Sequence, residues 1–151
     1  METTLSSHEN HRYLREKAGY FFLKDLCLIS AEGSDLFSYL QTQTTNDVNE
    51  LKPGQGQNNA IVDRKARVIS TFSLHRTGEE SAVILVETQQ KENLLDHLNS
   101  FLFREDVTLT LSNHFVLALQ GPKSQEIIKN FTRSDDSIPE KPNDICRFTF
   151  E

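Results

Sequence analysis

The fold of this 151-residue chain is decided by residues 59–86, which read NAIVDRKARVISTFSLHRTGEESAVILV. Three segments within this stretch are apolar or alternate between apolar and polar residues, and are expected to be strands: residues 60–62, 67–75 and 82–86. The last segment is apolar on both faces, as is typical of a strand inside a sheet. Short polar turns separate the three segments, so the stretch predicts an antiparallel meander.

The residues before the meander predict a strand followed by a helix. Residues 26–30 (LCLIS) form a short apolar run, and residues 33–35 offer a turn and an N-cap. Leu36, Phe37 and Leu40 would then share one face of the helix. Polar side chains that compete for backbone hydrogen bonds follow in the sequence TTND and are expected to end it.

The residues after the meander predict two more helices and two more strands. Thr88 is placed to cap a helix whose apolar side chains recur at helical spacing: Leu94, Leu95, Leu98, Phe101 and Leu102. Residues 107–111 and 115–119 are expected to be strands. Pro122 fits the first turn of the last helix, because no hydrogen bond is lost there. The inward-facing residues of that helix are expected to be Ile127, Ile128 and Phe131.

The two ends of the chain differ in pattern from its middle. Residues 1–12 are interpreted as a polar tail and residues 134–143, with two prolines, as a mobile connection. Residues 146–151 (CRFTFE) alternate like a strand that has just begun, which suggests a fragment of a larger protein. The order of elements predicts an α+β fold with mostly antiparallel sheets and packed helices.

The composition of the chain indicates which classes of partner and which cellular compartment to expect. Sixteen Lys and Arg residues against 22 Asp and Glu residues give a net charge of −6, which argues against nucleic acid as the main partner. No signal segment opens the chain, and no apolar run is long enough to span a membrane. Cys27 and Cys146 are far apart among apolar neighbours, so both are expected to be buried reduced thiols in a cytoplasmic protein.

The motifs of metal, phosphate and nucleophile chemistry are missing from the sequence. Only His8 and His11 are close enough to chelate a metal together, and they lie in the polar tail, so no metal is expected. Residues 54–56 (GQG) lack the third glycine and the preceding strand of a dinucleotide fingerprint. No G-x-S-x-G sequence is present, and no catalytic residue is assigned.

One positively charged cluster, consisting of Arg64, Lys65 and Arg67, lies at the tip of the predicted hairpin. Two interpretations of it stay open. The cluster can be a solvated turn that discourages edge-to-edge pairing. It can also dock an anionic tail, such as a polyglutamate or a phosphate.

Four stretches of the sequence resemble, in this order, the superfamily of glycine-cleavage T-proteins (aminomethyltransferases) and YgfZ-type folate-binding proteins. The stretches are LFSYLQTQTTNDV at 36–48, GQ at 54–55, the hairpin at 63–76, and LALQGP at 117–122. The resemblance covers about residues 26–131. It implies a three-domain ring with tetrahydrofolate in its central channel, of which this chain supplies the first part.

The resemblance also implies a division into domains. Residues 13–45 and 113–151 would belong to a discontinuous first domain, and residues 46–112 to an inserted αβ domain. The C-terminal remainder of the family fold would be absent.

The resemblance suggests four residues near the folate. T-proteins carry two consecutive aspartates where this chain has Ser70 and Thr71, and neither residue can be an anionic acceptor or base. A folate-contacting Tyr of the family falls at Asn58, and an Asn falls at Glu87. Asn58 and Glu87 can still hydrogen-bond a pterin or a glutamyl group, although solvated loop roles fit them equally well.

The hairpin sequence DRKARV is more similar to the YgfZ-type turn (Asp-x-Lys-Gly-Arg-Val) than to the paired-glycine turn of T-proteins. The expected function is therefore that of a folate-binding YgfZ-like protein, which the resemblance links to iron–sulfur proteins, iron–sulfur cluster maintenance and tRNA modification. One alternative is a glycine-cleavage aminomethyltransferase that uses a lipoyl carrier protein and tetrahydrofolate, with this fragment inactive alone. The other is a non-catalytic interaction module.

Overall fold

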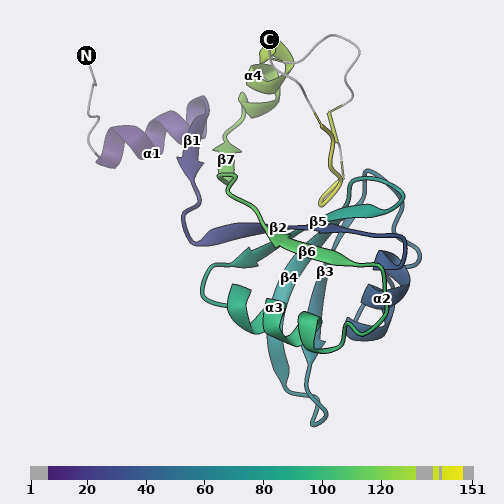
Figure 1. Cartoon of the computed structure of the whole chain (residues 1–151). Coiled ribbons are helices and arrows are strands. Elements are labelled where there is room, and N and C mark those ends of the chain that lie inside the picture. The colour runs from purple at the N-terminus through teal and green to yellow at the C-terminus, as the bar shows by residue number, and fades with distance from the viewer. Residues whose placement is uncertain (1–6, 132–137, 140, 148–151) are drawn as a thin grey trace. The chain divides into compact units, whose positions relative to one another are not determined.

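The computed structural model describes residues 7–131, 138–139 and 141–147 (Figure 1). Its contacts divide the chain into two compact units. The first unit comprises Met1–Leu23, Leu117–Ile138 and Arg147–Glu151, and the second comprises Lys24–Val116 and Pro139–Cys146. The boundaries predicted for the family's discontinuous and inserted domains concern a complete ring and stay predictions.

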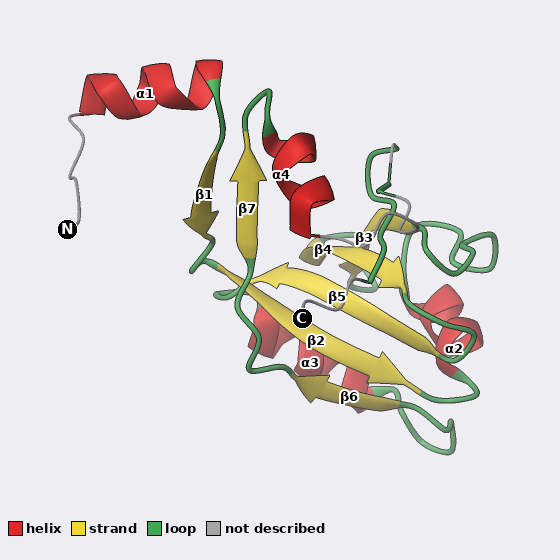
Figure 2. Cartoon of the chain, turned by 90° about the horizontal axis from the view of Figure 1, so that it is seen from above, coloured by secondary structure: helices red, strands yellow, loops and turns green. Residues whose placement is uncertain are grey.

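The second unit is built on a five-stranded antiparallel sheet with the strand order β3-β4-β5-β2-β6 (Figure 2). Its strands are β2 (Leu26–Glu32), β3 (Gly56–Val62), β4 (Val68–Arg76), β5 (Ser81–Glu87) and β6 (Thr108–Leu111). Its helices are α2 (Leu36–Gln43) and α3 (Lys91–Ser100). The predicted meander is therefore present as β3, β4 and β5, and the α+β prediction is confirmed.

The two helices lie on the same face of this sheet (Figure 2), which we call the covered face. Strand residues on this face are fully buried, including Ile29, Leu74 and Ile84. The Tyr39 hydroxyl of α2 donates to the Leu98 carbonyl of α3 at 2.5 Å, and burial raises the pKa of Tyr39 to about 12. The covered face therefore holds the hydrophobic core of the unit.

The first unit contains a two-stranded antiparallel sheet of β1 (Gly19–Phe22) and β7 (Leu117–Gln120), with helices α1 (Ser7–Glu16) and α4 (Ser124–Phe131). Gly121 has φ +123°, and a Cβ atom there would collide with the backbone of Lys17 and Ala18. The glycine is therefore required where β7 turns towards α4.

Residues 7–12 of the predicted polar tail form most of α1, a helix that was not predicted, whereas residues 1–6 lie outside the described residues. Charged residues such as Glu16 and Arg15 are good helix formers, so a helix needs no long apolar stripe. Strand β1 was missed because its partner β7 lies about a hundred residues away. Residues 134–137 and 140 of the predicted connection and residues 148–151 of the predicted strand lie outside the described residues, and Cys146 and Arg147 are in no strand.

Two predicted helix caps act differently in the structure. Helix α3 begins after Gln90, and the Thr88 hydroxyl instead donates to the Lys24 carbonyl at 3.4 Å. Asp35 precedes α2 but makes no side-chain cap bond, because its carboxylate accepts from the Asp106 backbone N–H at 2.9 Å. Both side chains connect segments far apart in the sequence, which local patterns do not reveal.

The prediction of two buried thiols is half wrong. Cys27 is partly buried, its Sγ lies 3.6 Å from the Val86 carbonyl, and burial raises its pKa. Cys146 is exposed, whereas the backbone N–H of its neighbour Ile145 donates to the Gly54 carbonyl. No helix in the described part of the chain is long and apolar enough to cross a membrane.

Candidate functional site

A groove of about 610 Å³ lies in the second unit, along β3, β4 and β5 near the start of β2. Most of the lining strand residues point to the sheet face opposite the helices, which we call the open face, whereas Asn59, Phe72 and Val86 belong to the covered face. Apolar residues in the lining include Leu26, Ala60 and Leu85, and polar ones include Asn58, Thr71, Ser73 and Glu87. An apolar floor with a few polar groups is the usual make-up of a small-molecule site.

Strand register explains why these residues meet. Asn58 lies opposite Ser73, and Ala60 lies opposite Thr71, so the four side chains share one face of the β3–β4 pair. The Ser73 hydroxyl donates to Asn58 Oδ1 at 2.9 Å. Ser73 was not among the predicted site residues, although period-two alternation places it on the same face as Thr71.

The loop after α2 forms one side of the groove. The Thr45 backbone N–H donates to the Ala60 carbonyl at 3.0 Å, and the Asn46 side-chain amide donates to the Asn58 carbonyl at 3.3 Å. These contacts hold the loop against the edge strand β3, and both Thr45 and Asn46 line the groove. The TTND stretch carried part of the family resemblance, but its local pattern predicted only a helix end and did not indicate that it borders this groove.

The predicted folate residues divide between two places. Asn58, Thr71 and Glu87 line the groove together. Ser70 does not: its side chain is 1% exposed and its hydroxyl donates to Gln90 Oε1 at 3.0 Å. Because adjacent strand residues point to opposite faces, Ser70 and Thr71 cannot both face one groove.

One buried amide on the covered face lacks partners. Asn59 lies between Asn58 and Ala60 on β3 and opposite Phe72, so its side chain points away from the open face. It is 5% exposed, and neither its Oδ1 nor its Nδ2 has a hydrogen-bond partner among the described residues. Asn59 therefore offers no side-chain group to the groove, whose donors and acceptors are those of Asn58, Thr71, Ser73 and Glu87.

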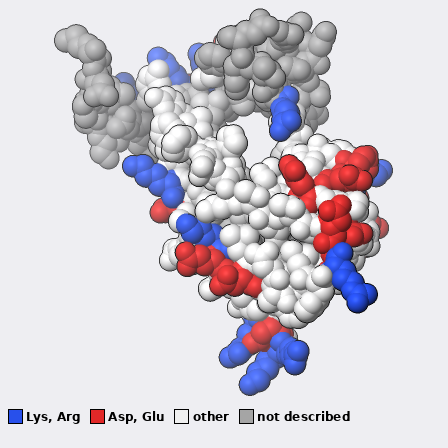
Figure 3. Space-filling view, in the orientation of Figure 1, with Lys and Arg blue, Asp and Glu red and all other residues white. Residues whose placement is uncertain are grey.

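The cationic cluster lies elsewhere, at the projecting tip of the β3–β4 hairpin (Figures 1 and 3). Arg67 forms an ion pair with Asp63 at 2.6 Å, and hydrogen bonds from Arg67 and Lys65 hold the pKa of Asp63 below its usual value. Arg64 lines a separate cavity of about 370 Å³ with His97 and Phe101. None of the three cations is among the described lining residues of the open-face groove.

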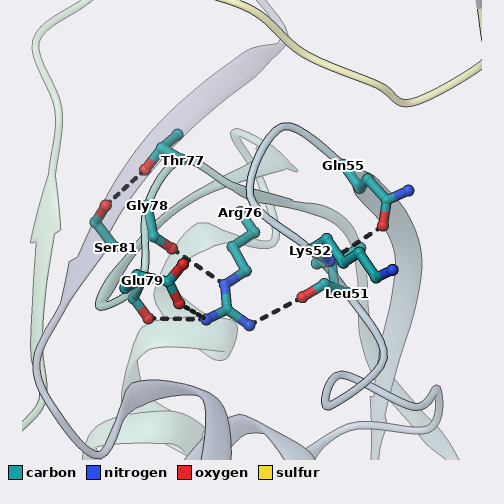
Figure 4. Close-up of polar contacts among 8 residues, drawn as sticks. All are labelled: Leu51, Lys52, Gln55, Arg76, Thr77, Gly78, Glu79 and Ser81. Atoms are coloured by element: carbon teal, nitrogen blue, oxygen red, sulfur yellow. Dashed lines mark hydrogen bonds and ion pairs between the residues drawn. The ribbon is translucent and has the colours of Figure 1, made fainter.

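Arg76, at the other end of β4, is a cation that no sequence pattern marked (Figure 4). Its guanidinium donates to the carbonyls of Leu51, Gly78 and Glu79 at 2.9–3.1 Å and to the Glu79 carboxylate at 3.0 Å. The guanidinium also stacks on the Phe37 ring, with its carbon 4.0 Å from the ring centroid. Arg76 therefore ties the 51–53 loop to the β4–β5 turn.

The described residues contain no group of three or more His, Cys, Asp or Glu side chains that could hold a metal ion. The carboxylate of the groove, Glu87, lies among hydroxyl and amide groups. This site is therefore suited to hydrogen bonding of an organic ligand.

Comparison with known proteins places this architecture in a family. Residues 2–144 match the model of the GCVT N-terminal domain. An aminomethyltransferase from Oceanobacillus iheyensis is 31% identical over 137 residues, covering 88% of this chain and 36% of the relative. An aminomethyltransferase from Thermus thermophilus is 29% identical over 139 residues, covering 91% of this chain and 40% of the relative.

A solved structure shares the fold. The glycine cleavage system aminomethyltransferase T from Bartonella henselae superposes with a TM-score of 0.74 at 22% identity, covering 81% of this chain and 34% of that one. The chain thus spans 36% to 40% of the length of these curated relatives. With the family model matching nearly its whole length, the chain belongs to the GCVT N-terminal domain family.

Proposed function

We propose that this chain is the folate-binding part of an aminomethyltransferase-type protein, and that its open-face groove takes the pterin ring of tetrahydrofolate. The observation that carries the proposal is the groove itself, where Asn58, Thr71 and Glu87 converge around an apolar floor. When bound, tetrahydrofolate would accept the one-carbon unit of an aminomethyl group. A lipoyl carrier protein is the partner that this activity would require.

The groups that line the groove match the needs of a pterin. Leu26, Ala60 and Leu85 offer apolar contact to a flat ring. Asn58 and Thr71 can both donate and accept hydrogen bonds, whereas an ionised Glu87 only accepts them. The residues of this chain would thus bind and orient the ring.

A second candidate is a folate-binding protein of the YgfZ type that does not transfer aminomethyl groups, with the suggested link to iron–sulfur proteins and tRNA modification. One observation favours it: the groove is lined by Thr71, a residue without a carboxylate, at the position where the family resemblance would place an aspartate of T-proteins. The comparisons named aminomethyltransferases, so this candidate ranks second. Folate-dependent release of ammonia from an aminomethyl-loaded carrier protein, measured with the complete protein, would distinguish the two.

Calorimetric titration of the 151-residue chain with tetrahydrofolate tests the binding proposal. We expect Thr71→Val to weaken binding about two- to tenfold, which corresponds to one hydrogen bond. Thr110→Val is the matched control, because Thr110 is exposed on β6, away from the groove. No detectable heat at high micromolar ligand, or equal losses in the two variants, would overturn the proposal.

The anion-docking hypothesis for the hairpin is tested with the same assay. The Arg64→Glu/Lys65→Glu double variant should weaken binding of polyglutamylated tetrahydrofolate a few-fold at low salt and less at high salt, because exposed charges are screened. The monoglutamyl form is the control ligand. If the double variant binds both forms as the wild type does, the cluster serves only as a solvated turn.

A further inference from the structure

The side chain of Gln90 connects a buried serine to the carboxylate at the groove. Gln90 Oε1 accepts hydrogen bonds from the Ser70 hydroxyl at 3.0 Å and from the Thr71 backbone N–H at 3.1 Å. Its Nε2 donates to Glu87 Oε2 at 3.0 Å. Gln90 itself directly precedes α3, three residues after the end of β5.

Strand pairing explains why Gln90 is needed at this point. The register of β4 with β5 ends at Phe72 opposite Val86, so the Thr71 N–H lies just beyond the last strand pair. The Gln90 side-chain oxygen accepts the bond that a further residue of β5 would have accepted. Ser70, 1% exposed, gains its hydrogen-bond partner from the same oxygen.

These contacts also fix which way the amide faces. A backbone N–H can only donate, so the group of Gln90 that meets Thr71 must be the oxygen. The NH₂ group must then face Glu87, whose carboxylate can accept from it. The orientation therefore follows from the backbone of β4 and leaves Glu87 Oε1 for other donors.

Resting on the folate-binding function proposed above, we propose that Gln90 is a positioning residue that holds the Glu87 carboxylate at the groove, so that the site selects ligand edges bearing N–H donors. The amino-pyrimidinone edge of a pterin has this chemistry, with an exocyclic amine beside a ring N–H. A fixed carboxylate can accept from both, and charge-assisted bonds of this kind are stronger than neutral ones. Ser70 would contribute through Gln90 rather than by touching the ligand.

Two substitutions separate positioning from structural support. Gln90→Glu keeps an oxygen for Ser70 and Thr71 but removes the donor to Glu87 and places a second negative charge beside it. Gln90→Met removes both the acceptor for Ser70 and Thr71 and the donor to Glu87, with a side chain of similar size. Gln89→Glu is the matched control, because Gln89 is a neighbour outside these hydrogen bonds that receives the same change in charge.

The readout is discrimination between tetrahydrofolate and its 2-desamino analogue, measured as the ratio of their dissociation constants by calorimetry, with thermal melting alongside. We expect Gln90→Glu to reduce this ratio about three- to tenfold while retaining most of the melting temperature. Gln90→Met should reduce both the ratio and the melting temperature, whereas Gln89→Glu should change neither of them. In a Glu87→Gln background, Gln90→Glu should cause no further loss of discrimination.

Each other outcome contradicts a specific claim. If the wild type does not bind tetrahydrofolate, the proposed function fails and this inference fails with it. If the wild type binds but Gln90→Glu keeps the wild-type ratio, only the positioning role is overturned. The positioning role is also overturned if Gln89→Glu lowers the ratio equally, since the effect would then be one of net charge.

Discussion

The two faces of the five-stranded sheet are made from the same strands, yet they differ in what their residues do. On β4, Phe72 and Leu74 are buried with the core, whereas Thr71 and Ser73 face the groove. Burial of side chains on the covered face stabilises the folded state, and this contribution depends on the apolar area buried rather than on chemical type. Those on the open face are free to carry polar groups, so sequence changes there can alter binding with little effect on folding.

The largest expected difference between the faces is in stability. Leu74→Ala should lower the free energy of unfolding by about 2–5 kcal/mol, because it opens a cavity at a residue with no exposed surface. Ser73→Ala, one position away on the open face, should cost about 1 kcal/mol through its hydrogen bond with Asn58. Urea denaturation followed by circular dichroism measures both, and similar losses would contradict the comparison.

The second contrast lies between the two ends of β4. Arg76→Met should destabilise the chain by about 2 kcal/mol, because it leaves the carbonyls of Leu51 and Gly78 without this donor. The matched Arg67→Met should change stability by less than about 0.5 kcal/mol, because the side chain of Arg67 is 74% exposed in its ion pair. Denaturation midpoints that fall equally in the two variants would refute the structural role assigned to Arg76.

The tip of the β3–β4 hairpin belongs to neither face of the sheet, so a substitution there tests backbone conformation alone. Ala66 has φ +59°, a left-handed conformation that disfavours side chains with a Cβ. Ala66→Gly should therefore stabilise the chain by about 0.5–1 kcal/mol, after allowing for the greater freedom of glycine in the unfolded state. Ala60→Gly, within β3, should instead destabilise the chain, because glycine is unfavourable inside a strand. Calorimetric melting decides the sign, and a destabilised Ala66→Gly would contradict the assigned turn.

The smallest expected effect concerns pH at the end of β4, where His75 meets the segment around Asn143. His75 Nδ1 lies 3.2 Å from the Asn143 carbonyl, and burial lowers the pKa of His75 below its usual value. The unfolded chain then binds the proton more tightly, so the stability conferred by neutral His75 is lost as pH falls through about 6.5.

His75→Gln should flatten this dependence when unfolding free energies are compared between pH 7.5 and 5.5. His114→Gln, at an exposed position, serves as the control and should keep the wild-type slope. If the unfolding free energy of the His75 variant depends on pH as steeply as that of the wild type, this histidine is not the source of the pH dependence.

Much of the fold followed from local pattern. The alternation in residues 67–75 predicted β4, and the apolar spacing after Thr88 predicted α3. Strand β7 was expected at residues 115–119 and is found at Leu117–Gln120. The misses were elements and contacts whose partners are remote: β1, which pairs with β7, and the side chains of Thr88 and Asp35.

The candidate site was less predictable. The family resemblance pointed to Asn58, Thr71 and Glu87, which the structure brings together, but it also pointed to Ser70, which lies on the covered face. Thr45 and Asn46 joined the groove through hydrogen bonds to β3. Gln90 carried no sequence signal, because its importance comes from three contacts made across the end of a sheet.

The sequence by itself determined the meander, the helices beside it and the family resemblance, because apolar periodicity and turn residues act between near neighbours. Only the tertiary structure decided which side of β4 is covered, which loop borders the groove and which amide holds Glu87. Those choices depend on how segments up to about a hundred residues apart pack and share hydrogen bonds. No single local stretch of the sequence therefore predicts these features.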